Sequence, residues 1–205
     1  MFNLLKGLLF GLAYVAPIGM QNLYVINTAL EQPKRRAYLI CAIVIFFDIS
    51  LSLACFFGVG QLLTTWPLLK LILFAGGGAF IAILGWQLIR STTTPLDVAS
   101  PKTAFKYRTA IMAAFAIAWL NPQAILDGTL LLGAFRASLP GLSGDLFVGG
   151  VAISSFVWFT SLTTIVSLLR SQLNPKVLMW INRVCGVVML GYAVKLLSNL
   201  VQALL

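Results

Sequence analysis

The feature that most constrains this chain is the recurrence of apolar runs long enough to cross a lipid bilayer. A transmembrane helix needs about 20 predominantly apolar residues. Six segments of the 205-residue chain reach that length: 4–30, 37–63, 67–89, 109–135, 145–169 and 177–204. Only 9% of the residues are charged, against about 25% in a soluble domain. We therefore expect an all-α integral membrane protein with six transmembrane helices, and continuous runs of this kind exclude the short alternating strands of a transmembrane barrel.

The net charge of +9 comes from 14 Lys and Arg residues against 5 acids, and its distribution predicts orientation. The loops between spans 1–2, 3–4 and 5–6 carry nine of the basic residues: Lys34, Arg35, Arg36, Arg90, Lys102, Lys106, Arg108, Arg170 and Lys176. The opposite side carries three: Lys6, Lys70 and Arg136. Because positive residues concentrate on the cytoplasmic side, we expect these three loops in the cytoplasm and both termini outside. The charge then faces membrane lipid and predicts no nucleic-acid partner.

A weak internal repeat divides the chain into two halves of three spans. At an offset of 105, Pro17 aligns with Pro122 and Asn22 with Asp127; at an offset of 106, residues 84–86 align with 190–192. Because each half has an odd number of spans, the two copies have opposite orientations, as in many secondary transporters. This predicts one membrane domain, 1–205, built from inverted repeats 1–90 and 109–205 and a cytoplasmic linker 91–108. A chance match between short apolar words is the alternative.

Two acidic residues fall at membrane depth, where an ionisable group is costly and usually functional. Asp48 is eleven residues past Ala37, about 16 Å into the bilayer and near its midplane. Asp127 is eighteen residues past Thr109, about 27 Å along its helix and in the outer third. We interpret Asp48 as a site for a substrate ammonium or a coupling proton. The alternatives are a buried acid bonded to Ser or Asn of another span for Asp48, and pairing with Arg136 or a helix end for Asp127.

Each half also has a proline inside its first apolar run. Pro17 and Pro122 lack an N–H group and clash with the preceding turn, and Gly19 loosens the first break further. We therefore expect spans one and four to break at depth, which is tolerated only where the freed backbone groups line a cavity. Four side-chain amides flank the breaks: Gln21, Asn22, Asn121 and Gln123. Amide donors together with carboxylates suit the zwitterionic groups of an amino acid.

Other features predict ordinary membrane packing. Gly7 and Gly11 form a GxxxG pattern, which we interpret as a helix-packing face. Four tryptophans are interpreted as interfacial anchors or lipid-facing bulk: Trp66, Trp86, Trp158 and Trp180. Span five is rich in hydroxyl groups, which we expect to bond mainly to carbonyls of their own helix, with exposure to the cavity as the alternative.

The motif residues 16–22, the acid Asp48 and residues 119–127 resemble the lysine/arginine exporter (LysE-type) family, in its basic-amino-acid branch. The resemblance implies gradient-driven export of lysine or arginine through the bacterial inner membrane, with a proton as coupling ion and no cofactor. The matching functional residues are Gln21, Asn22, Asp48, Asn121, Pro122 and Asp127. Gln123 departs from the pattern, because relatives tend to have His there. The chain has no His at all, so proton coupling would depend on carboxylates.

Three alternatives remain on sequence grounds. The substrate could be a neutral amino acid or another small cation, although a chain without His and with scattered Cys is a poor transition-metal binder. An intramembrane thiol-redox enzyme is disfavoured because Cys41, Cys55 and Cys185 form no CxxC pair. A scaffold subunit would gain nothing from acids at depth. We expect a transporter rather than an enzyme, without a metal site, and leave homo-oligomer formation open.

Overall fold

The computed structural model describes residues 2–17, 19–58, 66–90, 106–139, 141–170 and 175–204. This part of the chain folds entirely into helices and turns. Its helices are α1 (Phe2–Val15), α2 (Met20–Glu31), α3 (Lys34–Phe56), α5 (Pro67–Arg90), α6 (Tyr107–Trp119), α7 (Pro122–Ser138), α8 (Leu142–Leu169) and α9 (Pro175–Leu204). The expected helical class is confirmed, and the helices begin and end close to the predicted segments. Most of the predicted linker, residues 91–105, lies outside the described residues.

The described helices account for three to five membrane spans. Three are long and apolar enough by themselves: α3, α8 and the segment Arg183–Gln202 of α9. The pairs α1–α2 and α6–α7 each qualify if the two helices are counted as one broken span. In α5, the apolar stretch Phe74–Gln87 is shorter than the length counted here as a membrane span.

The two breaks occur where the prolines predict them. The axis turns by 76° between α1 and α2, and by 57° between α6 and α7. Pro17 and Gly19 lie in the first interruption, while Pro122 is the first residue of α7. Proline fits that first helical position because the missing N–H group has no acceptor there anyway. Each of these two apolar runs therefore bends at its proline.

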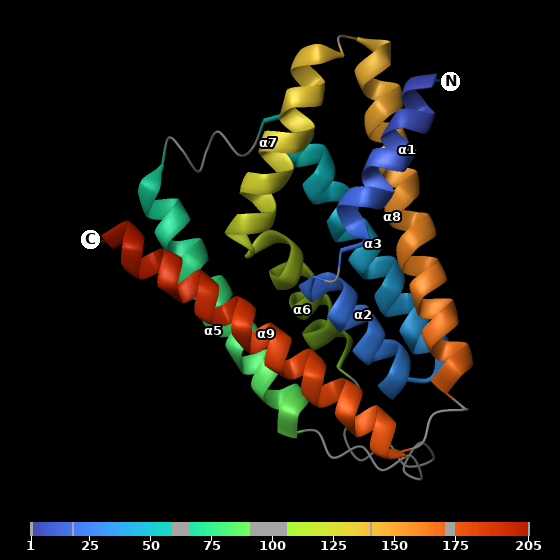
Figure 1. Ribbon diagram of the computed structural model, residues 1–205, viewed down its shortest axis with the longest axis vertical. Coiled ribbons are helices and arrows are strands. Elements are labelled where there is room, and N and C mark those ends of the chain that lie inside the picture. The colour runs from blue at the N-terminus through green and yellow to red at the C-terminus, as the bar shows by residue number, and fades with distance from the viewer. Residues whose placement is uncertain are drawn as a thin grey trace.

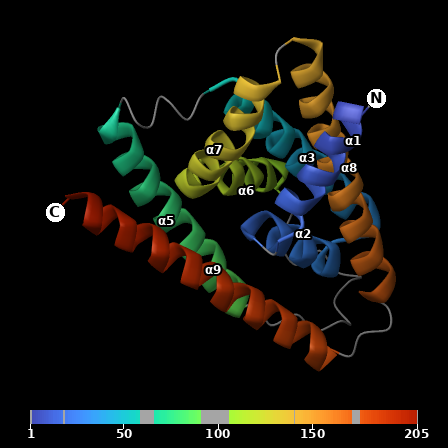
Figure 2. The ribbon, with the colours of Figure 1, turned by 45° about the horizontal axis from the view of Figure 1, so that its top comes forward.

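Two closely packed helix pairs frame the molecule (Figure 1). The α1 helix lies along α8, and α5 lies along α9 in the antiparallel direction, with Gly78 against Leu197 and Gly85 against Gly186. The α3 helix packs against α8, α6 and α7. The view in Figure 2 shows the α5–α9 pair beside the bundle of α1, α3 and α8, with α2 and α6 between the two groups.

Glycines bring the backbones of α1 and α8 into direct contact. A Cβ atom at Gly7 would collide with the carbonyl oxygen of Phe147, and one at Gly150 would collide with the carbonyl oxygen of Leu4. Gly11 likewise has no room beside Ser154. Small residues allow this close approach in membrane helices, where van der Waals contact replaces the hydrophobic effect as the driving force. The GxxxG pattern therefore serves helix packing within the chain, as predicted.

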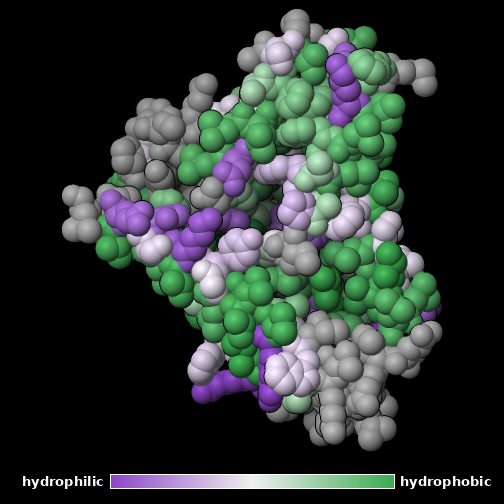
Figure 3. All heavy atoms as spheres, viewed as in Figure 1, coloured by the Kyte–Doolittle hydropathy of each residue, from purple (hydrophilic) through white to green (hydrophobic). Residues whose placement is uncertain are grey.

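The outer surface is apolar. Large side chains such as Phe46, Leu130 and Phe156 are 66%, 72% and 58% exposed. Figure 3 shows hydrophobic residues over most of one face, with hydrophilic residues around a hollow near its middle. An apolar exterior of this kind fits a protein surrounded by lipid.

Adjacent glycines of α8 provide a matched test of this packing. We expect Gly150→Ala to lower the free energy of unfolding by about 1–3 kcal/mol, because the added methyl group forces α1 away from α8. Gly149→Ala, where no atom lies within 4 Å of the new Cβ, should be neutral or stabilising by up to about 1 kcal/mol. Thermal unfolding in detergent measures both. Equal stability of the two variants would contradict the proposed contact.

Candidate functional site

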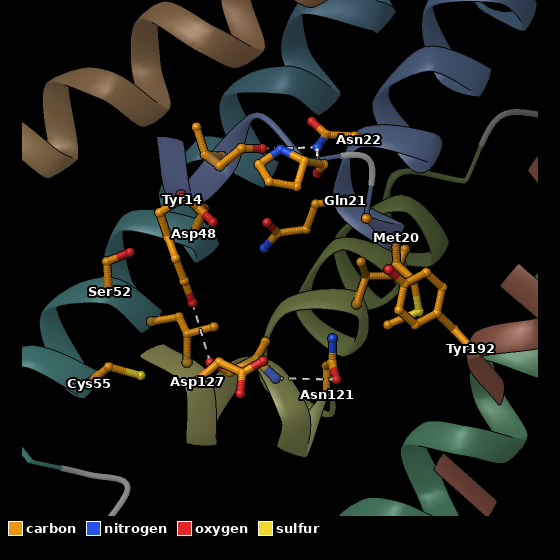
Figure 4. Close-up of a pocket in the computed structure, with 16 residues that line it drawn as sticks. Tyr14, Met20, Gln21, Asn22, Asp48, Ser52, Cys55, Asn121, Asp127 and Tyr192 are labelled. Carbon is orange, nitrogen blue, oxygen red and sulfur yellow. Dashed lines mark hydrogen bonds between the residues drawn. The ribbon is translucent and has the colours of Figure 1, made fainter. Parts of the chain in front are cut away.

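A cavity of about 210 Å³ lies where the two broken spans meet. Its lining comes from α1, α2, α3, α6, α7, α9 and both breaks, as Figure 4 shows. Its polar or ionisable side chains are Tyr14, Gln21, Asn22, Asp48, Ser52, Cys55, Asn121, Asp127 and Tyr192. We call this space the central cavity. It collects five of the six polar residues that the sequence predicted for the site, from three separate segments of the chain.

Asp48 contributes a buried carboxyl group to the central cavity. It lies in the middle of α3 and only 6% of its surface is exposed. The side chains of Ser155 on α8 and Gln21 on α2 lie within hydrogen-bonding reach of it. In Figure 4 Asp48 and Gln21 point toward the same space. The two interpretations of Asp48 are therefore compatible, because the acid bonds to a hydroxyl group of another helix and also lines a cavity.

Asn22 holds the first break together. Its Nδ2 atom donates to the carbonyl oxygens of Val15 at 3.0 Å and Pro17 at 2.7 Å. These carbonyls lie at the end of α1, where the helix can no longer supply partners. Both amide protons of Asn22 are thus used inside the protein. This residue lines the cavity but its hydrogen bonds stabilise the break.

The interpretation of Trp158 as a lipid-facing or interfacial residue is wrong. Its Nε1 atom donates to Oδ1 of Asn22 at 2.8 Å, and the side chain is half-buried. The three other tryptophans that were interpreted in this way, Trp66, Trp86 and Trp180, are 63%, 49% and 62% exposed. Trp158 differs from them because it lies near the middle of α8, and its indole N–H group needs an acceptor there. That mid-span position was the available sequence signal.

Asn121 stabilises the second break, as Asn22 stabilises the first. It is the N-cap residue of α7, and its side-chain oxygen accepts a hydrogen bond from the backbone N–H of Ala124 at 3.4 Å. It also lines the central cavity. The side chains of Pro122 and Gln123, which were also predicted site residues, lie outside the described residues.

Asp127 lines the same cavity as Asp48. In Figure 4 it lies on the α7 side, beyond Tyr14 as seen from Asp48. The alternative partner considered for it, Arg136, forms an ion pair with Asp145 at 3.6 Å. The cavity therefore has one carboxyl group from each half of the chain.

Sequence reasoning missed two tyrosines that connect the broken spans. The hydroxyl of Tyr14 on α1 donates to the carbonyl oxygen of Ala124 on α7 at 3.4 Å. The hydroxyl of Tyr24 on α2 donates to the carbonyl oxygen of Ala110 on α6 at 3.3 Å. Each half of the first broken span is thus bonded to one half of the second. Two tyrosines within an apolar run, on either side of Pro17, were the signal.

Three hydroxyl groups of α8 bond within their own helix, as expected for this span. Ser154 and Ser155 donate to the carbonyl oxygen of Val151 at 2.6 and 3.3 Å. Thr164 donates to the carbonyl oxygen of Thr160 at 2.7 Å. Ser155 additionally approaches Asp48, so one member of this group reaches the site.

Removing the indole N–H group tests the bracing of the first break. We expect Trp158→Phe to leave Oδ1 of Asn22 buried without a donor, which costs about 1–3 kcal/mol. Hydrogen exchange at residues 15–22 should quicken, and thermal unfolding in detergent should occur at lower temperature. Trp180→Phe is the control, since that exposed side chain should change stability by less than about 0.5 kcal/mol. Unchanged exchange in Trp158→Phe would show that the bond does not brace the break.

Comparison with known proteins gives a consistent set of relatives. The family model described as LysE type translocator matches residues 12–200. The arginine exporter protein ArgO of Pectobacterium carotovorum is 34% identical over 94% of this chain and 95% of the relative. The ArgO proteins of Serratia proteamaculans and Escherichia coli K12 are 31% and 32% identical, over 94% and 93% of this chain and 94% and 91% of theirs. No solved structure matches the chain significantly.

Proposed function

Because the chain belongs to the LysE type translocator family, we propose that it exports the basic amino acids arginine and lysine across the bacterial cytoplasmic (inner) membrane. The relatives named arginine exporters cover nearly its full length. The observation that carries the substrate class is the central cavity, in which Asp48 and Asp127 line one space beside two broken helices. The protein is then a secondary transporter that needs no cofactor, and not an enzyme.

The charges of the cavity match those of the substrate. Arginine and lysine each carry two cationic groups and one carboxylate at neutral pH. Asp48 and Asp127 supply one negative charge for each cationic group. The N-terminus of α2 offers the positive end of a helix dipole to the substrate carboxylate. This end is accessible because its N-cap residue, Gly19, forms no side-chain cap and lines the cavity.

The arrangement of helices supports two inverted repeats, residues 1–90 and 109–205, joined by the linker 91–108. Exchanging the halves pairs the broken span α1–α2 with α6–α7, α3 with α8, and α5 with α9. The packing of α1 on α8 then corresponds to that of α6 on α3, and the α5–α9 pair maps onto itself. Movement of the broken span of one repeat against the broken span of the other would expose the cavity to each side of the membrane in turn.

The same proposal assigns coupling to a proton gradient. A proton antiporter needs a group that is protonated on one side and released on the other, and the chain contains no His. Asp48 and Asp127 are the acids that line the central cavity. Competition between a proton and a cationic substrate for these carboxylates would link the two movements. The hydrogen bonds of Tyr14 and Tyr24 connect the two repeats on the two sides of the first break. One of them would break when the cavity opens to one side of the membrane, and the other when it opens to the opposite side.

Orientation follows from charge together with one contact. A guanidinium nitrogen of Arg170, after α8, donates to the carbonyl oxygen of Gln32, after α2, at 2.7 Å. This bond supports a common side for loops 1–2 and 5–6. The concentration of basic residues there makes that side cytoplasmic, with loop 3–4 beside them and both termini outside.

Neutralising the central acid tests the proposed transport. We expect Asp48→Asn to lower arginine export at least about 30-fold, because removing one partner of a buried charge pair costs about 2–5 kcal/mol. Cells with this variant should be as sensitive to a toxic arginine analogue as cells lacking the gene. The control is Asp145→Asn, an acid in an exposed ion pair with Arg136, which should export normally. Wild-type efflux from Asp48→Asn would refute the assigned site.

Reporter fusions test the orientation. An enzyme that is active only outside the cytoplasm should be active when fused after Leu205, and inactive when fused in the loop near Lys34. The physical reason is the retention of positively charged loops in the cytoplasm. The reverse pattern would overturn the proposed topology.

A further inference from the structure

A second hollow, of about 530 Å³, lies between α2, α5 and α6, at the ends that we assign to the cytoplasm. We call it the vestibule. Its lining includes Glu31 and Asn27 from α2, Gln87 from α5, and Lys106 and other residues at the start of α6. The proposed function gives the vestibule no role, because the central cavity already holds the two acids that compensate the substrate cations.

The vestibule has one acid and one base among its lining residues. Glu31 ends α2, and Lys106 precedes α6. The guanidinium of Arg170 interacts electrostatically with Glu31 and donates to the neighbouring carbonyl of Gln32. Arg170 thus stabilises the end of α2 but is not part of the vestibule lining. A carboxylate and an ammonium group on different helices are complementary to the ammonium and carboxylate groups of an amino acid.

An unpartnered polar atom lies on the same lining. Oδ1 of Asn27 is buried, and no hydrogen-bond donor reaches it within the described part of the chain. Buried acceptors in native proteins nearly always have a partner, and a bound group or a water molecule is one explanation for an exception. This atom is therefore available to an N–H donor of a ligand that enters the vestibule.

Tyr24 connects the lining of the vestibule with that of the central cavity. It lines the vestibule, and its hydroxyl bonds α2 to the carbonyl oxygen of Ala110 on α6. Its ring packs against the core group that contains Met20 and Ile117, and both of those residues line the central cavity. The two spaces thus lie along the same pair of helices, and Tyr24 lines one of them and packs on residues that line the other.

We propose that the vestibule is a second, weaker binding site for a basic amino acid, in which Glu31 holds the α-ammonium group, Lys106 the α-carboxylate, and Asn27 accepts a remaining N–H. The inference rests on the proposed function, since it takes its ligand from the exported substrate. The vestibule would collect substrate from the cytoplasm before Tyr24 releases its bond to Ala110 and opens the way to Asp48.

Binding to the full-length protein in lipid nanodiscs tests this site apart from the central one. In the Asp48→Asn background, titration with arginine should show one residual, weaker binding event. Adding Glu31→Gln should weaken that event about tenfold or more, as expected for the loss of a charge-assisted hydrogen bond. Adding Asp145→Asn instead should leave it unchanged. An unaltered residual affinity with Glu31→Gln, or no residual binding, would refute the vestibule as a binding site.

The substrate carboxylate is tested with agmatine, which is arginine without that group. Lys106→Gln should lower the residual affinity for arginine and leave that for agmatine unchanged. Lys34→Gln, a neighbouring exposed lysine at the start of α3, should affect neither. Equal losses for both ligands with Lys106→Gln would contradict the assigned carboxylate contact.

A labelling measurement covers the case in which Glu31→Gln fails to fold. In Asp48→Asn protein, arginine should slow the reaction of a thiol reagent with Thr109→Cys, whose side chain lies on the vestibule lining. Ser138→Cys, exposed at the end of α7, should show no protection. Absence of protection at residue 109 would overturn the proposal. Export by Asp48→Asn at the wild-type rate would instead refute the proposed central site, which separates the two failures.

Discussion

The structure depends on the way in which broken helices satisfy their backbone groups inside a membrane. Hydrocarbon offers no hydrogen-bond partners, so a carbonyl freed by a break must find one in the protein. At the first break, the single amide of Asn22 bonds to the carbonyls of Val15 and Pro17, and Trp158 from another helix fixes that amide. At the second, Asn121 caps α7. These bonds hold two sharp bends open, and the central cavity exists because the bends face each other.

The helices of this molecule make two kinds of contact. Those made through glycines are stiff, and those made through tyrosine hydrogen bonds can separate. Backbones touch directly between α1 and α8 and approach closely between α5 and α9, and a contact without side chains has few alternative arrangements. The broken spans, in contrast, are connected to each other through the tips of Tyr14 and Tyr24. The proposed alternating access requires the broken spans to move apart. The hydrogen bonds of the two tyrosines permit this, because a terminal hydrogen bond can be exchanged with water at little cost.

Local chemistry explains what the sequence could predict. The helices and the breaks follow from run length and from proline, whose effects act within a few residues. Asp48 could be predicted as a site residue from the energetic cost of burying a charged group in a membrane. Depth arithmetic for Asp127, however, assumed a straight helix and said nothing about its distance from Asp48. The axis bends by 57° before this residue, and both acids line the same cavity. The partnership of Trp158 with Asn22 joins residues 136 positions apart, which no local pattern encodes.

The tyrosine bonds have a consequence for the evolution of the family. Both hydroxyls donate to main-chain carbonyl oxygens, of Ala124 and Ala110, and every amino acid carries that atom. Substitutions at positions 110 and 124 therefore keep the acceptor, and the hydrogen bond itself does not require a compensating change in the tyrosine. Inference of contacts from correlated substitutions will miss both connections, although they join residues 110 and 86 positions apart. Only the constancy of the tyrosines themselves would record the bonds.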